Sequence, residues 1–179
     1  MKKDLFFWSE IIGVPAIYCI ATLLHFVYYL SGGTALSILF GAVNESVWEH
    51  VKIFAAGYTA YAALELLWTK ASFKKFLVAK VCALYVLSGL IIGFFYLYTA
   101  FTGRNIPIVD ILSSLLFVCI AQMVSYRLTL TKKDTKRYFH EAAMLLMLYF
   151  LMFFSFTIFP PQCGLFQDPV TGGYGIPHL

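Results

Sequence analysis

The feature that most constrains this chain is a series of five long apolar segments, each bounded by charge, glycine or proline. They cover residues from about 10 to 30, 51 to 68, 76 to 101, 108 to 130 and 142 to 159. The hydrocarbon layer of a membrane is about 30 Å thick and a helical residue rises about 1.5 Å, so a membrane helix needs about 20 apolar residues. The segments therefore predict five transmembrane helices.

Composition supports this prediction. Of the 179 residues 61% are hydrophobic and 12% are charged, whereas a soluble domain is about half apolar and a quarter charged. A core of this size cannot bury such an excess, which excludes a water-soluble enzyme. An aromatic content of 18% excludes a disordered chain. The net charge of +4 lies in short clusters between apolar segments, so we expect membrane lipids and no nucleic acid as partners.

The connections between these segments alternate in lysine and arginine content. The N-terminus and the second and fourth connections are basic, the first connection and the C-terminal tail have neither residue type, and the third connection has only Arg104. Because basic residues resist translocation, this alternation predicts a cytoplasmic N-terminus and an extracytoplasmic C-terminus.

The short connections predict one transmembrane domain over residues 1–179, an all-α polytopic bundle whose consecutive helices are antiparallel. The apolar stretch 34–43 is too short to cross and is expected to form an interfacial or re-entrant segment. The tail, residues 160–179, contains apolar side chains such as Phe166 and is expected to fold back on the extracytoplasmic surface. An odd number of spans argues against inverted halves within one chain, and a homo-dimer would supply such a pair.

Polar and ionisable side chains converge on the extracytoplasmic half of this predicted bundle. Each costs about 2.5–3.5 kcal/mol in hydrocarbon, so each needs a partner or a role. Their convergence predicts a ligand-binding or acid/base pocket. The main candidates are His25, Glu45, Glu49, His50, Lys52 and Asp110, and the secondary candidates near this face are Asn44, Trp48, Tyr96 and Tyr98. Two more secondary candidates lie at other depths: Glu65 toward the cytoplasmic end of its segment and Gln122 deeper in its own.

The segment 44–52 adds a spacing argument. If it is helical, Glu45 and Glu49 lie one turn apart on one face, and His50 points about 100° away from Glu49. Two carboxylates and an imidazole suit a divalent metal, with His25 or Asp110 completing the shell, so the metal candidates are Glu45, Glu49, His50 and His25. General acid/base chemistry at a carboxylate and His50 is the other hypothesis. No cofactor is required by the sequence.

Structural roles compete with these hypotheses. Ser46 followed by Glu49 matches a capping box, and Trp48 is typical of an interfacial anchor. Asn44 and Asp110 suit helix caps, and acids near a helix start are favoured by the dipole. Glu65 suits an interfacial position and Gln122 a hydrogen bond across helices.

Two stretches carry a family resemblance: Asn44–Lys52, read as NESVWEHVK, and residues 159–176, from the paired prolines through DPVTGGYGI. The chain resembles an uncharacterised family of small five-span bacterial membrane proteins, domain of unknown function 6512. The resemblance implies the bacterial cytoplasmic membrane and carries over no catalytic residue. In that family a histidine often follows the paired prolines; here Gln162 and Cys163 stand there, so that part of the tail implies no metal role.

Three functions remain open at this point. The first is binding or transport of a small molecule, an ion or a lipid headgroup at the extracytoplasmic face. The second is a membrane-embedded enzyme, metal-dependent or not, acting on a lipid or lipid-linked substrate. The third is a structural or accessory subunit. The sequence favours the first, because it contains no recognised nucleophile and no complete metal motif.

Overall fold

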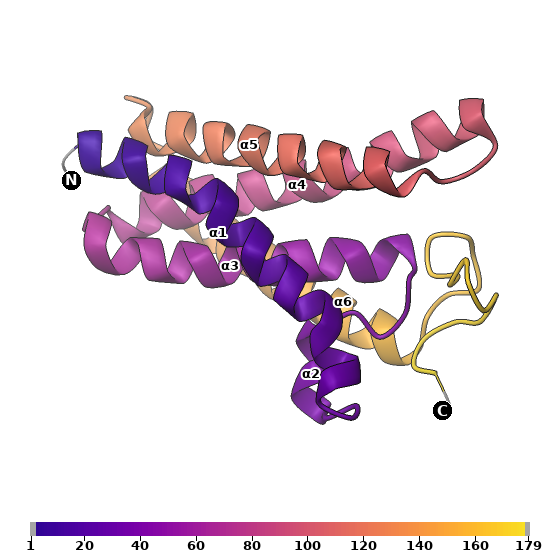
Figure 1. Cartoon of the computed structure of the whole chain (residues 1–179). Coiled ribbons are helices and arrows are strands. Elements are labelled where there is room, and N and C mark those ends of the chain that lie inside the picture. The colour runs from indigo at the N-terminus through magenta and orange to yellow at the C-terminus, as the bar shows by residue number, and fades with distance from the viewer. Residues whose placement is uncertain (1–2, 178–179) are drawn as a thin grey trace.

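The computed structural model describes residues 3–177, and long helices dominate this part of the chain (Figure 1). The elements are α1 (Lys3–Leu30), α2 (Ala35–Phe40), α3 (Val47–Thr69), α4 (Phe73–Thr102), α5 (Pro107–Leu130), the 3-10 turn η1 (Lys136–Tyr138) and α6 (Phe139–Ile158). Each predicted apolar segment coincides with one long helix to within a few residues at most boundaries, although α1 begins earlier. The short stretch forms α2. The prediction of an all-α bundle is confirmed.

Four of the long helices are apolar enough to cross a membrane: α1, α4, α5 and the segment Lys136–Ile158 that contains α6. The remaining long helix, α3, has 23 residues and carries Glu49, Lys52 and Glu65 inside the bundle. Its charged side chains are covered by protein, so α3 does not need the apolar surface of its neighbours.

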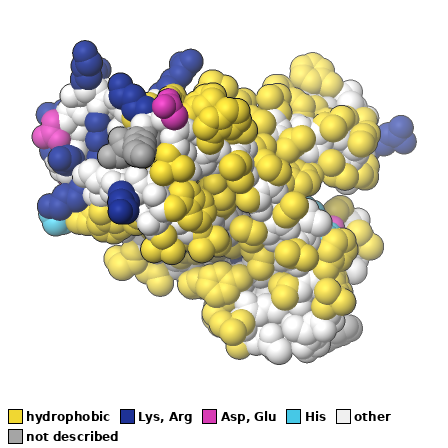
Figure 2. Space-filling model, turned by 60° about the vertical axis from the view of Figure 1, so that its left-hand side comes forward, with side chains coloured by type: hydrophobic (Ala, Val, Ile, Leu, Met, Phe, Trp, Pro, Cys, Tyr) yellow, Lys and Arg dark blue, Asp and Glu magenta, His cyan; other side chains and the backbone are white. Residues whose placement is uncertain are grey.

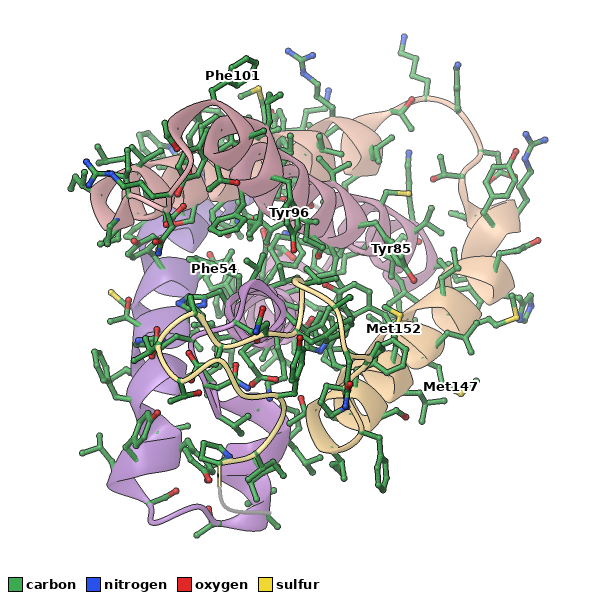
Figure 3. All side chains as sticks on the ribbon, turned by 90° about the vertical axis from the view of Figure 1, so that its right-hand side faces the viewer. Phe54, Tyr85, Tyr96, Phe101, Met147 and Met152 are labelled. Atoms are coloured by element: carbon green, nitrogen blue, oxygen red, sulfur yellow. The ribbon has the colours of Figure 1, made fainter. Side chains whose placement is uncertain are left out.

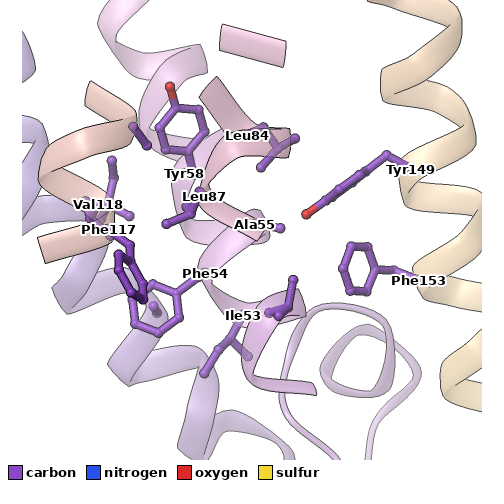
Figure 4. Packing of buried hydrophobic residues seen from close by; sticks show 14 of the residues in the cluster. Ile53, Phe54, Ala55, Tyr58, Leu84, Leu87, Phe117, Val118, Tyr149 and Phe153 are labelled. Atoms are coloured by element: carbon purple, nitrogen blue, oxygen red, sulfur yellow. The ribbon is translucent and has the colours of Figure 1, made fainter. Parts of the chain in front are cut away.

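The core lies where the long helices meet. α1 packs on α3 and α5, α4 packs on α3 and α5, and α6 packs on α4. Figure 4 shows Leu84 and Leu87 of α4 beside Ala55 of α3, with Tyr149 and Phe153 of α6 approaching from the opposite side to Phe117 and Val118. These side chains are buried and bring α3 to the centre of the packing.

The two ends of the bundle differ in charge. The end that holds the start of α1, residues 70–75 and residues 131–138 gathers lysines and arginines, and we call it the basic end (Figure 2). The flank is covered by hydrophobic side chains, and Leu23, Leu67 and Phe101 are among the most exposed. A contiguous apolar surface of this kind is typical of a lipid-facing flank.

The opposite end, which we call the tail end, holds residues 31–46, 103–106 and 159–177. The last segment lies across it (Figure 3). The Trp48 backbone N–H donates to the Leu165 carbonyl at 3.1 Å, and Asn44 Nδ2 donates to the Gly175 carbonyl at 2.8 Å. These two bonds tie the segment to the start of α3, and Phe166 is buried there.

Candidate functional site

The start of α3 separates the side chains of the 44–52 motif. The helix begins at Val47, and Ser46 is its N-cap, with extended backbone and a side chain that accepts from the Glu49 N–H. Glu45 therefore precedes the helix, and the expectation that Glu45 and Glu49 share one helical face is wrong. Only half of the capping box forms, because the Glu49 carboxylate turns to the Val43 N–H and Asn44 Oδ1 accepts from the Ser46 N–H.

Three of the predicted residues meet at the tail end: His25 of α1, Glu45 of the α2–α3 connection and His50 of α3. The Nε2 atom of His25 lies 3.7 Å from Glu45 Oε1, and Nε2 of His50 lies 3.6 Å from Glu45 Oε2. One ligand atom from each residue lies within 4.8 Å of the others. We call this cluster the His-Glu-His triad.

The spacing in the triad exceeds that of a hydrogen bond. Two ligands at about 2.0–2.1 Å from a tetrahedral Zn²⁺ ion stand about 3.3 Å apart, close to the observed separations. The side chains are half-buried, with exposures of 25% for His25 and 37% for Glu45 and His50. The triad is therefore reachable from outside, and its three donors leave room for a fourth ligand.

The two Nδ1 atoms of the histidines in the triad differ in their surroundings. Nδ1 of His50 lies 2.9 Å from the Ser46 carbonyl oxygen, which only accepts, so in the neutral ring Nδ1 carries the proton and the lone pair of Nε2 faces Glu45. Metal-binding histidines commonly use such a backbone acceptor to fix their tautomer. Nδ1 of His25 is buried without a hydrogen-bond partner.

Glu49 and Lys52 lie elsewhere, inside the bundle. Lys52 Nζ is 2.6 Å from Glu49 Oε2 and donates to the Ile38 carbonyl at 2.9 Å. Thr157 of α6 donates to Glu49 Oε1 at 2.9 Å. The prediction that Glu49 joins His50 in one site is therefore not met, because Glu49 serves as the buried partner of Lys52.

The remaining tail-end candidates have structural contacts. Trp48 stacks on Phe153, with ring centroids 4.3 Å apart, and also packs against Phe166 of the tail. Asn44 connects the tail to the helix cap. These two residues therefore hold the tail against α3 and α6.

Asp110 and the tyrosines of α4 lie outside the triad. Tyr98 donates to Asp110 Oδ1 at 2.7 Å and accepts from the Ile106 N–H at 3.0 Å, which fastens the connection between α4 and α5. Tyr96 lies beside the tail (Figure 3), where a Cβ at Gly164 would be 3.7 Å from its hydroxyl oxygen. The predicted meeting of His25, Glu49 and Asp110 in one cavity is thus not what the structure contains.

Glu65 and Gln122 belong to a second polar cluster nearer the basic end. Lys80 of α4 lies 2.6 Å from Glu65 Oε2 and 2.9 Å from Glu10 Oε2, and it donates to Gln122 Oε1 at 3.3 Å. The sequence pattern places Lys80 just inside the 76–101 segment, where it counts with the basic second connection, and it gives Glu10 only as the start of the first segment. The missed signal is that Glu10, Glu65 and Lys80 all fall within apolar segments, where each ionisable group needs a partner.

A side groove of about 180 Å³ opens between α3, α4 and α6, away from the triad. Its walls are almost entirely apolar, and they include Tyr58, Phe76 and Leu146. Lys80 also contributes to the wall, so the groove runs beside the second cluster. An apolar groove on this hydrophobic flank suits hydrocarbon chains rather than a polar ligand.

Comparison with known proteins gives a family and no function. The chain matches a family described as a family of unknown function, DUF6512, over residues 3–176. No curated protein and no solved structure matches the chain.

Proposed function

The chain belongs to DUF6512, and we propose that it is an integral membrane protein that binds a small ligand at its tail end, for which a divalent metal ion fits the available groups best. The observation that carries the proposal is the position of Glu45 between the two imidazoles, at 3.7 Å and 3.6 Å. Two histidines and one carboxylate form a donor set that Zn²⁺ uses in proteins.

The proposal also assigns the two ends of the bundle to the two sides of the membrane. The lysines and arginines lie mainly at the basic end, and such residues mark the cytoplasmic side. The triad then faces the extracytoplasmic side of a bacterial cytoplasmic membrane. A metal ion arriving from outside would meet the half-buried triad without crossing the hydrocarbon layer.

The test is equilibrium binding of Zn²⁺ to the purified, chelator-treated full-length protein in detergent. The His50→Ala and His25→Ala variants are expected to bind at least about tenfold more weakly, because each removes one of three protein ligands. His140→Ala is the matched control, since this exposed histidine lies at the basic end. Equal affinity in wild type and in both triad variants would overturn the proposal.

A second candidate function, metal-dependent catalysis, is favoured by the number of donors. Catalytic zinc sites have three protein ligands and an open position for water, whereas structural sites have four. A zinc-loaded protein would then hydrolyse a lipid or lipid-linked substrate, and His50→Ala would abolish turnover. Zinc flux into proteoliposomes without product formation would instead support transport. Zinc binding with neither turnover nor flux would leave binding as the function.

A further inference from the structure

The second polar cluster is formed by Glu10, Glu65 and Lys80. It lies inside the bundle and shares no residue with the triad. The three residues come from α1, α3 and α4, and their exposed fractions are 4%, 0% and 4%. Lys80 Nζ lies between the two carboxylates, 2.9 Å from Glu10 Oε2 and 2.6 Å from Glu65 Oε2. One ammonium group thus serves two carboxylates in a site closed to solvent.

The charges of this cluster do not balance. Two ionised carboxylates and one ammonium group sum to −1, and no other ion pair among residues 3–177 involves Glu10 or Glu65. The Glu49–Lys52 pair provides the contrast, since one carboxylate there meets one ammonium group. An unbalanced charge in a low-dielectric interior is so unfavourable that the group normally becomes neutral instead.

The hydrogen bonds distinguish the two carboxylates. Both oxygens of Glu10 have donors, because Ser125 donates to Oε1 at 2.6 Å and Lys80 donates to Oε2. Glu65 meets only Lys80, and its Oε1 is buried without a hydrogen-bond partner. Glu10 is therefore the carboxylate that its neighbours stabilise as an anion, and Glu65 is the one that lacks such support.

The polar groups around the cluster can accommodate a bound proton but offer too few free oxygen atoms for a metal cation. The Tyr58 hydroxyl is buried and unpartnered, and its ring centroid lies 5.4 Å from Lys80 Nζ. Tyr61 donates to the Ser9 carbonyl. A metal cation would need several free oxygens, whereas three of the four carboxylate oxygens already face Lys80 or Ser125.

We propose that this cluster is a proton-binding site. Glu65 takes up one proton and becomes a neutral carboxylic acid, while Glu10 and Lys80 remain an ion pair and the cluster carries no net charge. Gln122 of α5 holds the cluster by donating to the Glu10 carbonyl at 3.0 Å, so four helices meet at the site. Release of the proton leaves a buried negative charge and weakens the packing of α1, α3, α4 and α5.

The test uses infrared spectroscopy of the full-length protein in detergent at neutral pH. The wild type is expected to show the carbonyl band of a protonated carboxyl group, shifted in D2O, and Glu65→Gln is expected to lose it. Charge balance makes a further prediction: Glu10→Gln also loses the band, because the remaining Glu65 and Lys80 then balance. Glu141→Gln, at an exposed glutamate, is the control and keeps the band.

Three outcomes would overturn the proposal. The first is a wild-type protein that shows no band of a protonated carboxyl group. This outcome includes a protein that lacks the band and is stabilised by Na⁺, because a cation would then replace the proton. Another is a band that survives Glu65→Gln. The last is a band that survives Glu10→Gln, since charge balance would then not hold the proton. Should either variant fail to fold, a pH titration of the wild type tests the proposal instead. The band is expected to disappear reversibly as the pH is raised, and a band that does not would overturn the proposal.

Discussion

Lys52 Nζ lies 2.6 Å from Glu49 Oε2 in the interior of the bundle, where both side chains are almost completely buried. The other polar contacts of the pair are to Thr157 of α6 and to the backbone of Ile38 and Val43. The pair therefore connects α3 to α6, to α2 and to the connection between α2 and α3. Its residues belong to the NESVWEHVK motif, yet their contacts are those of a structural element.

Replacing Lys52 by methionine is expected to destabilise the protein strongly. Glu49 would lose its counter-ion and would have to carry an unpaired buried charge or take up a proton, and breaking a buried pair in this way costs about 3–5 kcal/mol. The double variant Glu49→Gln with Lys52→Met should lose less, because no buried charge remains. The free energy of unfolding in mixed detergent micelles measures both effects. Lys132→Met, at an exposed lysine, is the control, and an equally stable Lys52→Met would contradict the assignment.

The tautomer of His50 gives a prediction that needs no metal. Because Nδ1 lies 2.9 Å from a carbonyl oxygen, the neutral ring must carry its proton on Nδ1. Nitrogen-15 chemical shifts of histidine-labelled protein above neutral pH are expected to show an Nδ1–H, with the resonance assigned by its loss in His50→Gln. A ring protonated on Nε2 would show that His50 does not present a lone pair to Glu45.

Most of the fold was predictable because hydropathy and helix length are properties of contiguous residues. The five apolar segments, the short helix near residues 34–43 and the charge difference between the ends all follow from local sequence. Helix α3 shows the limit. Its Glu49, Lys52 and Glu65 lower its hydropathy, and only the packing of the other helices explains why it lies inside.

The candidate site was predictable in part, because residue types indicate chemistry whereas partners depend on packing. His25, Glu45 and His50 do meet. Glu49 was grouped with them on the assumption that the helix extends back to Glu45, but the helix begins at Val47. The ion pair between Lys80 and Glu10 joins residues that are 70 positions apart in the sequence, a separation that no local spacing rule can detect.

Gly13 marks a close contact between α1 and its neighbours. A methyl group at this position would overlap the Gln122 amide and the Tyr61 ring. Gly13→Ala is therefore expected to destabilise the protein by about 1–3 kcal/mol, as overpacking of a core does. Gly89→Ala is the matched control, because a Cβ there meets nothing within 4 Å and alanine favours a helix by about 0.5–1 kcal/mol. Thermal unfolding of the two variants should move in opposite directions, and equal shifts would refute the contact.

Cys163 offers a direct test of orientation. It is exposed in the tail, which the proposed topology places outside the cytoplasmic membrane. A membrane-impermeant maleimide is expected to label wild-type protein in intact cells and to leave Cys163→Ala unlabelled, because the other three cysteines, Cys19, Cys82 and Cys119, lie within the long helices that the proposed topology places in the membrane. Lys132→Cys in the Cys163→Ala background should react only after permeabilisation, since residue 132 lies at the basic end. The reverse pattern, with residue 132 accessible and Cys163 protected, would invert the topology and place the His-Glu-His triad on the cytoplasmic side.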